Sequence, residues 1–271
     1  MRGRWECGGC GCQTSVTAGT IFQDTRTPLP VGFRAMWWLT TQKNGASALG
    51  LQRVLGLKEY RTAWTMLHRL RRAMVRPGRD LLTGRVEVDE CDIGGLEEGL
   101  LGRLNLKKAL VVVIAAQEDG PGIGRIRMRQ IVDASAESLI PFVQDSVAPG
   151  SLIHTDGWLG YLPLGRKGYR HQVTFLRGKK KTPSELMPRV HQVVSLLKRW
   201  LMGTHQGAVS HKYLDYYLDE FTFRFNRRRS KSRGKLFFRL AQQAVAVDPV
   251  TYYGIVHTHP GKPKPQSIGV T

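Results

Sequence analysis

Three consecutive segments with strand-like patterning constrain the fold of this chain most. Residues 86–93 alternate between apolar and polar side chains, the segment of residues 108–116 is continuously apolar after Lys108, and residues 124–132 alternate again. Alternation is typical of a strand with one buried face, whereas a short apolar run fits a central strand that is covered on both faces. Three such strands in succession predict a sheet within an α/β domain.

The chain after residue 132 completes this pattern. A helix is expected to begin at Asp133 or Ser135, either of which can cap it, and to end near Val147. Two strands and two helices are expected to follow, over residues 152–156, 169–175, 184–202 and 212–226. Three strands, a helix, one or two further strands and then helices is the order of a ribonuclease-H-like domain, so we expect a mixed sheet with flanking helices.

A helical region is expected before the sheet. Helices are predicted over residues 33–41, 47–55 and 60–74, with Gly56 as the turn between the second and the third. This layout is typical of a helix-turn-helix, whose second helix enters the major groove of DNA. That helix is basic, and its candidate DNA contacts are Arg61, Arg69 and Arg72.

The charge of the chain points to a polyanionic partner. Lys and Arg number 41 against 21 Asp and Glu, which gives a formal net charge of +20. Each cationic side chain that meets a phosphate releases condensed counterions, so such an excess favours nucleic acid over a small metabolite. Residues 1–13 lack an apolar leader, and the longest apolar run, residues 109–116, is too short to span a bilayer. We expect a cytoplasmic protein that lies beside the chromosome (nucleoid-associated), with no membrane partner.

Two basic segments are candidate phosphate contacts, although charge runs are often only solvated surface. The first is a loop at residues 177–181, and the second follows a predicted helix at residues 224–235. The candidate DNA-binding residues are these two segments' Lys179, Lys180, Lys181, Arg224, Arg227 and Arg228, together with Arg199 from the predicted helix 184–202.

The cysteines are clustered near the N-terminus. Cys7, Cys10 and Cys12 form one knuckle, which is half of the four-ligand set of a zinc ribbon. In a reducing compartment such a cluster favours metal over disulfides, so Cys7 and Cys10 are candidate zinc ligands. The alternative is a remnant of a ribbon with free thiols.

Two aspartates occupy similar places in the predicted sheet. Asp89 lies within the apolar strand 86–93, and Asp156 ends the strand 152–156, where Gly157 allows the backbone to turn away. A carboxylate on a buried strand is costly unless a charge pairs with it, and a divalent cation is such a charge. Two carboxylates on neighbouring strands can hold a pair of Mg²⁺ or Mn²⁺ ions. The alternative for either aspartate is a turn or an ion pair.

A third group comes from the long helix after the sheet. His191, Ser195 and Lys198 lie on one helix face because offsets of four and seven residues close on two turns. A histidine directed at the metal site, with a lysine behind it for a phosphate, is chemically sensible. We therefore name Asp89, Asp156, His191 and Lys198 as the candidate catalytic residues, while a lone helical histidine can also be a structural hydrogen bonder.

These residues resemble a family of bacterial insertion-sequence transposases. The resemblance, which covers roughly residues 5–240, lies in Gly19-Thr-Ile-Phe22 after a Cys knuckle, Val86-Glu-Val-Asp89-Glu90 with Gly94-Gly95, Thr155-Asp156, residues 197–205 and residues 213–227. The nearest group is the insertion-sequence family numbered 1595, whose catalytic domain is called ISXO2-like. It implies a zinc ribbon, a helix-turn-helix and a metal-dependent DDE domain that cuts double-stranded DNA at element ends and joins the freed 3′-hydroxyl to a target. It also implies a homo-oligomer on DNA, because two ends must meet.

Two departures from the family pattern bear on activity. The third metal-site residue of the family is commonly Asn or Glu, and here the aligned residue is His191, with Glu185 as a substitute candidate. The first Cys knuckle of the ribbon is missing. Two alternatives to an active transposase are therefore a decayed or domesticated DNA-binding relative and a ribonuclease-H-like nuclease without strand transfer.

The expected organisation has four parts. They are a partial zinc ribbon (1–22), a helix-turn-helix region (23–80), the catalytic domain (81–243) and a Pro/Gly-rich tail (244–271).

Overall fold

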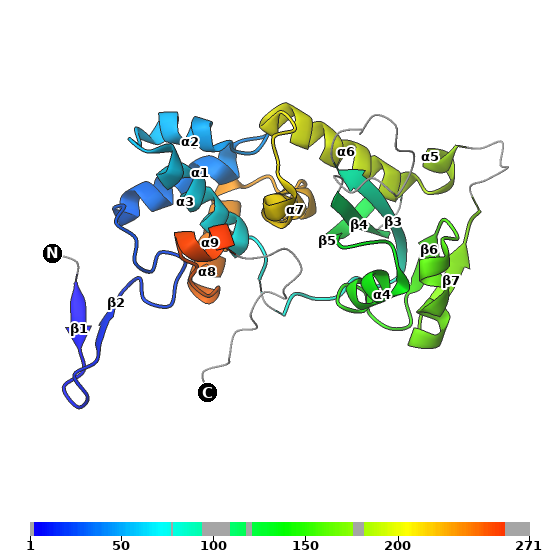
Figure 1. The fold of residues 1–271 in the computed structure, drawn as a ribbon, viewed down its shortest axis with the longest axis horizontal. Helices are drawn as coiled ribbons and strands as arrows, with labels where there is room; N and C mark the ends of the chain where they lie inside the picture. The colour runs from blue at the N-terminus through cyan, green and yellow to red at the C-terminus, as the bar shows by residue number, and fades with distance from the viewer. Residues whose placement is uncertain (1–2, 77, 94–108, 118–120, 176–181, 258–271) are drawn as a thin grey trace. The chain divides into compact units, whose positions relative to one another are not determined.

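The chain folds into two units. The computed structural model describes residues 3–76, 78–93, 109–117, 121–175 and 182–257 (Figure 1). Unit 1 combines residues 1–79 with residues 230–271, and unit 2 is the contiguous segment 80–229.

Unit 2 is built on a five-stranded mixed sheet. The strands are β3 (Arg85–Ile93), β4 (Ala109–Gln117), β5 (Ile123–Ile131), β6 (Leu152–Thr155) and β7 (Arg170–Val173). Their order across the sheet is β5-β4-β3-β6-β7. The β3–β4 and β4–β5 pairs are antiparallel, whereas β3–β6 and β6–β7 are parallel. The mixed sheet expected from the sequence is confirmed.

Helices pack on the two faces of this sheet (Figure 1). Even-numbered residues of β3, such as Val86 and Val88, join a core with α4 (Ala136–Gln144) and the 3-10 helix η2 (Leu159–Lys167). Ile93 joins a second core with α6 (Pro188–His205) and α7 (Leu214–Asn226). The period-two alternation of β3 therefore separates the two cores.

The predicted helices of unit 2 are present with small differences. The first is α4, which starts after Ser135, and Asp133 accepts hydrogen bonds from the Ser135 and Ser138 hydroxyls. The helix expected over 184–202 consists of two pieces, α5 (Pro183–Leu186) and α6, because Pro188 begins a new helix. The helix expected from residue 212 begins as the short 3-10 turn η3 (His211–Tyr213) before α7.

Unit 1 contains the predicted helical region. Its first three helices are α1 (Leu29–Thr41), α2 (Ala48–Leu55) and α3 (Tyr60–Ala73). The hydroxyl of Ser47 caps α2, and Gly56 ends it in a left-handed conformation with φ 63° that residues other than glycine rarely adopt. The turn predicted at Gly56 is therefore confirmed, and DNA binding by α3 stays a prediction.

The chain returns to unit 1 after residue 229, which the sequence did not predict. Helix α8 (Arg233–Ala246) packs against α1 and α3, and α9 (Tyr252–His257) packs against α3. Unit 2 ends at residue 229, whereas the sequence-based boundary of the expected catalytic domain is residue 243, and residues 244–257 of the expected tail are partly helical. Leu236, Leu240 and Ala244 on α8 are buried within unit 1, which explains why this helix belongs to unit 1. Residues 258–271 lie outside the described part of the chain.

The N-terminal segment forms a small hairpin. Strands β1 (Arg4–Glu6) and β2 (Gln13–Ser15) pair antiparallel. None of the helices in the described ranges is both long enough and apolar enough to cross a membrane.

Candidate active site

Asp89 and Asp156 lie on neighbouring parallel strands of unit 2. The register pairs Val86 with Ile153 and Glu87 with His154. Continued two residues further along both strands, this register brings Asp89 opposite Asp156, which directly follows β6. The sheet thus places together the two carboxylates that the sequence singled out, at the carboxyl end of β6, where open α/β sheets commonly bind ligands.

The turn after β6 requires glycine. Gly157 has φ 86°, and a Cβ added to it would lie 2.9 Å from side-chain atoms of both Val173 and Phe175. The carboxylate of Asp156 accepts a hydrogen bond from the Trp158 backbone N–H at 3.0 Å. Asp156 therefore sits at the start of a tight turn, as the sequence predicted.

Helix α6 brings His191 to this place. Its Nε2 lies 3.8 Å from Oδ2 of Asp89, which is longer than a hydrogen bond. This nitrogen is buried and has no hydrogen-bond partner among the residues that the structure describes. Burial lowers the pKa of His191, while the charges of Glu87 and Asp156 oppose part of that shift. At neutral pH the imidazole is therefore uncharged and has a lone pair available for a ligand.

Lys198 lies two turns further along α6. It is exposed, and its charge acts on the thiol of Cys91, which follows Asp89 on the same face of β3. Burial nevertheless raises the pKa of Cys91 to about 12, so this thiol stays protonated at neutral pH and is a poor nucleophile. Between them, the Ser195 hydroxyl donates to the His191 carbonyl at 2.9 Å, a bond that helical serines commonly make four residues back.

Glu87 holds the first turn of α6 and was not singled out from the sequence. Its side chain is 2% exposed, and Oε2 accepts from the backbone N–H groups of Arg189 and Val190 at 2.8 and 2.9 Å. The other oxygen forms an ion pair with the Arg189 guanidinium at 3.1 Å. The unpaired N–H groups and the positive end of a helix favour a carboxylate there. Because Glu87 and Asp89 are two residues apart, strand alternation signals that both face α6.

Glu90 points to the opposite face. Its carboxylate accepts a hydrogen bond from the Tyr161 hydroxyl at 2.7 Å. Burial raises the pKa of Tyr161, and the charges of Glu90, Asp89 and Asp156 add to the effect. Tyr161 thus remains a neutral donor that ties β3 to η2 next to the two aspartates.

The donors at this place suit a divalent cation. Carboxylate oxygens are the preferred ligands of Mg²⁺, and an uncharged imidazole nitrogen also suits Mn²⁺. The buried, unpartnered Nε2 of His191 is the observation that fits such a ligand best. Among the described residues no three His, Cys, Asp or Glu side chains form a complete metal-binding group, so the two aspartates and His191 are not a preassembled ligand set.

Glu185, the substitute candidate, has a local role. It is exposed, and its carboxylate accepts hydrogen bonds from the Thr182 N–H and hydroxyl at 2.6 and 3.0 Å. It therefore caps the short helix α5.

Three predicted DNA contacts have internal partners within unit 2. Arg224 forms an ion pair with the fully buried Glu220 at 2.8 Å. The guanidinium of Arg227 stacks on Phe223, and that of Arg228 donates to backbone carbonyls of β5. Contact of these arginines with DNA stays a prediction.

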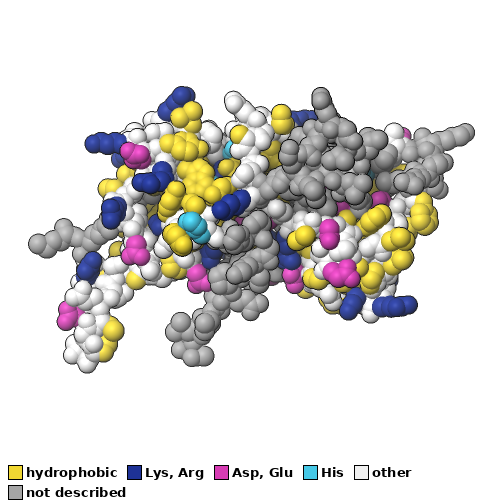
Figure 2. All heavy atoms as spheres, in the orientation of Figure 1, with side chains coloured by type: hydrophobic (Ala, Val, Ile, Leu, Met, Phe, Trp, Pro, Cys, Tyr) yellow, Lys and Arg dark blue, Asp and Glu magenta, His cyan; other side chains and the backbone are white. Residues whose placement is uncertain are grey.

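The remaining cationic candidates differ in exposure. Arg199 and Arg61 are exposed, whereas Arg69 and Arg72 are partly buried. On the face drawn in Figure 2, Lys and Arg side chains project at several points over the helices of unit 1. Lys179, Lys180 and Lys181 lie outside the described residues, as do Gly94 and Gly95 of the resemblance motif.

The cysteine knuckle forms the turn of the N-terminal hairpin. Cys7, Cys10 and Cys12 are exposed free thiols. Hydrogen bonds from the Gly9 and Cys10 backbone and from the Cys10 thiol lower the pKa of Cys7, which favours the thiolate that binds zinc. Zinc binding by Cys7 and Cys10 stays a prediction.

More than half of the chain matches the model of a known protein family. The model of the family described as the ISXO2-like transposase domain matches residues 81–226, which lie within unit 2 and contain all four candidate catalytic residues. No curated protein matches the chain.

Proposed function

Because this chain belongs to the ISXO2-like transposase domain family, we propose that it is an insertion-sequence transposase that cuts DNA at element ends and joins the ends to a target. A DDE transposase domain implies a ribonuclease-H-like fold, and the mixed sheet of unit 2 agrees with it. The observation that supports the proposal best is the position of His191 Nε2, 3.8 Å from the carboxylate of Asp89, a residue of the strand that pairs in parallel with the one preceding Asp156.

In this proposal each candidate residue has a separate role at the reacting phosphate. Asp89 and Asp156 would hold Mg²⁺ or Mn²⁺, and the neutral His191 would bind a metal ion or orient a water molecule beside them. When bound there, two such ions lower the pKa of the attacking water or 3′-hydroxyl and stabilise the leaving oxygen. Lys198 contacts a non-bridging oxygen of the phosphate, and Glu87 positions α6 so that His191 and Lys198 reach the site.

The basic surface binds double-stranded DNA in the same proposal. Arg199 lies next to Lys198 and is exposed, and unit 1 supplies Arg61, Arg69 and Arg72. Such binding releases counterions, so we expect affinity to fall steeply as salt rises. A flat response to salt would remove the electrostatic basis of the proposal. We also propose a homo-oligomer on DNA, which light scattering of the protein with and without end DNA tests.

The decisive experiment is a cleavage and strand-transfer assay on labelled DNA from both ends of the element. Wild type, Asp156→Ala and Asp145→Asn are compared with Mg²⁺ and with Mn²⁺. Asp145 is an exposed carboxylate that pairs with Arg129 and serves as the matched control. We expect joined products from wild type and the control, and none from Asp156→Ala. Joined products from Asp156→Ala would overturn the assignment.

The departure at His191 has its own test. His191→Glu restores a carboxylate at this position, and His191→Asn restores an amide. If His191 lies in the metal site, His191→Glu raises activity with Mg²⁺ relative to Mn²⁺, because Mg²⁺ favours oxygen ligands. An unchanged ratio of activities with the two metals would place His191 outside the ligand set.

Position 191 carries a histidine where the family commonly has Asn or Glu. This departure favours the second candidate, a DNA-binding relative without catalysis. Under this alternative Asp89→Asn leaves both DNA binding and biological effect unchanged. Under the transposase proposal the same variant binds DNA as wild type does but yields no cleavage. A protein that cleaves without joining would instead be a nuclease.

A further inference from the structure

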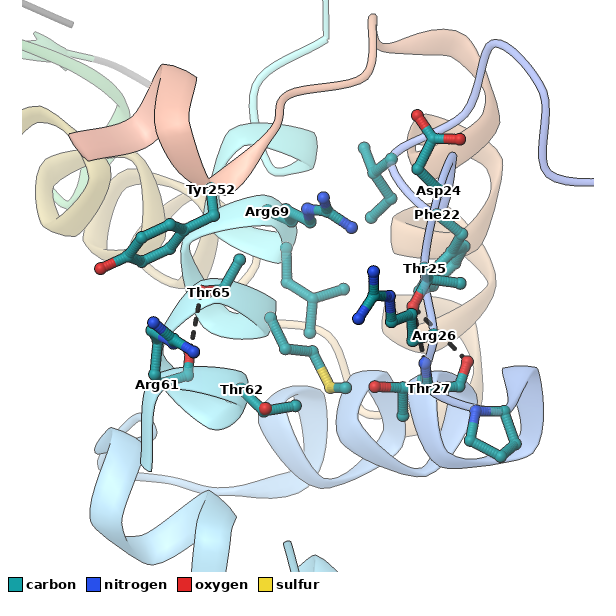
Figure 3. Close-up of a pocket in the computed structure, with 15 residues that line it drawn as sticks. Phe22, Asp24, Thr25, Arg26, Thr27, Arg61, Thr62, Thr65, Arg69 and Tyr252 are labelled. Atoms are coloured by element: carbon teal, nitrogen blue, oxygen red, sulfur yellow. Dashed lines mark hydrogen bonds between the residues drawn. The ribbon is translucent and has the colours of Figure 1, made fainter. Parts of the chain in front are cut away.

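One pocket of unit 1 is lined by an excess of positive charge. It has a volume of about 390 Å³ and lies between α3, the segment of residues 21–28 and α9. Its charged lining residues are Arg26, Arg61, Arg69 and Asp24, so cations outnumber anions three to one. Figure 3 shows the Arg69 and Arg26 guanidinium groups reaching into the pocket from opposite walls, with Arg61 at its edge beside Tyr252.

The walls of the pocket are held by specific contacts. The Ile21 backbone N–H donates to the Ala244 carbonyl of α8 at 3.1 Å, which anchors the segment of residues 21–28. The Arg61 guanidinium lies over the ring of Tyr252, with 5.5 Å between its carbon and the ring centroid. Ile21 and Leu70 are fully buried beneath the pocket. The segments that carry these arginines are therefore packed against the rest of unit 1.

One nitrogen of the partly buried Arg69 lacks a hydrogen-bond acceptor among the residues that the structure describes. This nitrogen, Nε, is itself buried. Burial lowers the pKa of Arg69, and the charge of Asp24 opposes part of that shift. A buried donor without an acceptor is costly, and an anionic oxygen would satisfy it.

We propose that this pocket binds one backbone phosphate of double-stranded DNA, clamped between Arg69 and Arg26 with Arg61 at the entrance. The planar guanidinium forks suit phosphate oxygens. The proposal rests on the proposed function, which supplies DNA as the partner, and it adds a discrete site to it. It also changes the role of α3. The face of α3 that carries Arg61 and Arg69 borders a walled pocket, so these arginines position the DNA backbone and do not read base edges.

The first test measures how DNA affinity depends on salt. The full-length variants Arg26→Gln and Arg69→Gln are compared with wild type on two duplexes of unrelated sequence. Arg34→Gln is the matched control, because Arg34 is exposed on α1 and does not line this pocket. We expect each pocket variant to bind both duplexes about tenfold more weakly. The slope of log K against log salt should fall by about 0.9 when one phosphate contact is lost.

The outcomes separate this proposal from the proposed function. If wild type binds neither duplex, DNA as partner fails. If wild type binds with a steep salt response but the pocket variants match Arg34→Gln, only the pocket proposal is overturned. A loss confined to one duplex would indicate base readout and would also overturn it. Arg26 is exposed, so Arg26→Gln keeps the test valid even if Arg69→Gln unfolds the protein.

A third variant, Asp24→Asn, is expected to raise DNA affinity, whereas the arginine variants lower it. Asp24 is exposed at φ 55°, a conformation that Asn adopts readily, so Asp24→Asn keeps the backbone while removing a negative charge. We expect this variant to bind both duplexes several-fold more tightly at low salt. Equal or weaker binding would contradict an anion site at this pocket.

Free phosphate compounds are the other source of the same chemistry. Inorganic phosphate and a nucleoside monophosphate are titrated as competitors of the labelled duplex, against chloride of equal ionic strength. We expect weak, millimolar competition from both, which Arg26→Gln abolishes. Micromolar binding of the mononucleotide, with duplex affinity unaffected by Arg26→Gln, would assign the pocket to a free nucleotide and overturn the DNA proposal.

Discussion

The carboxylate of Glu87 links the chemistry of the candidate site to the packing of the sheet. It lies two residues before Asp89 on β3 and accepts three hydrogen bonds from the first turn of α6. A buried carboxylate in this position is stabilised by the helix N-terminus and by the Arg189 guanidinium. It therefore sets where α6 begins and, through α6, where His191 meets Asp89.

Glu87→Gln is expected to lower the free energy of unfolding by about 2 kcal/mol, because it weakens the acceptor and leaves the Arg189 guanidinium without its counter-charge. The measurement is urea unfolding followed by circular dichroism. Glu137→Gln, an exposed glutamate in the first turn of α4, is the control and should change stability by less than about 0.5 kcal/mol. Equal losses of unfolding free energy in the two variants would show that the buried Glu87 cap stabilises the fold no more than an exposed glutamate does.

The imidazole of His171 on β7 should make the free energy of unfolding depend on pH. Burial lowers its pKa, and its Nε2 lies 2.9 Å from the hydroxyl of the buried Thr155. As pH falls, His171 binds a proton in the unfolded chain near its ordinary pKa of about 6.5, whereas in the folded chain it does so only at lower pH. Stability is therefore lost as pH falls below this value towards the folded pKa. His171→Gln should flatten the decline measured by urea unfolding between pH 7.5 and 5.5, and an unchanged decline would exclude His171 as a cause.

At the scale of elements, α7 completes the edge of the sheet. β5 has β4 on one side only, so its outer backbone groups lack a neighbouring strand. The Asn226 side chain accepts from the Ile126 N–H at 2.7 Å and donates to the Ile126 carbonyl at 3.1 Å. Asp215 accepts from the Gln130 N–H, and Arg228 donates to the Ile123 carbonyl. Side chains of α7 and the residues after it thus replace a strand.

Asn226→Asp tests this edge with a nearly isosteric change. The variant keeps an acceptor for the Ile126 N–H but places a carboxylate oxygen against the Ile126 carbonyl in place of a donor. We expect a loss of about 2 kcal/mol in the free energy of unfolding, measured by thermal or urea unfolding. Asp215→Asn keeps its acceptor and should cost less than half as much. The reverse ranking would contradict the role given to Asn226.

At the scale of the whole molecule, the chain leaves unit 1, forms unit 2 and returns. Both hydrophobic clusters of unit 2 consist of residues between Leu82 and Phe225. The buried residues of α8, in contrast, belong to unit 1. Unit 2 therefore has its own cores, whereas unit 1 depends on two distant segments of the chain.

A fragment of residues 80–229 is expected to unfold cooperatively in urea, as a domain with its own cores does. A fragment of residues 81–243, the boundary that the sequence favoured, carries α8 without its partners α1 and α3. It should bind a dye for exposed apolar surface more strongly than the shorter fragment does. A shorter fragment that shows no cooperative transition would mean that unit 2 depends on unit 1.

The order of strands and helices in unit 2, apart from the 3-10 helix η2, follows from the sequence alone, because periodicity and caps are local signals that do not depend on tertiary contacts. The sequence also singles out Asp89, Asp156 and His191 as candidates, since a carboxylate in or at the end of an apolar strand and the spacing of a later helix residue can be read along the chain. The contacts that these residues make depend on the tertiary structure. The cap that Glu87 provides for α6, the internal partners of Arg224 and Arg228, and the return of α8 to unit 1 all join residues far apart in the sequence. Such contacts depend on sheet register and on which apolar faces bury one another, and no local pattern encodes them.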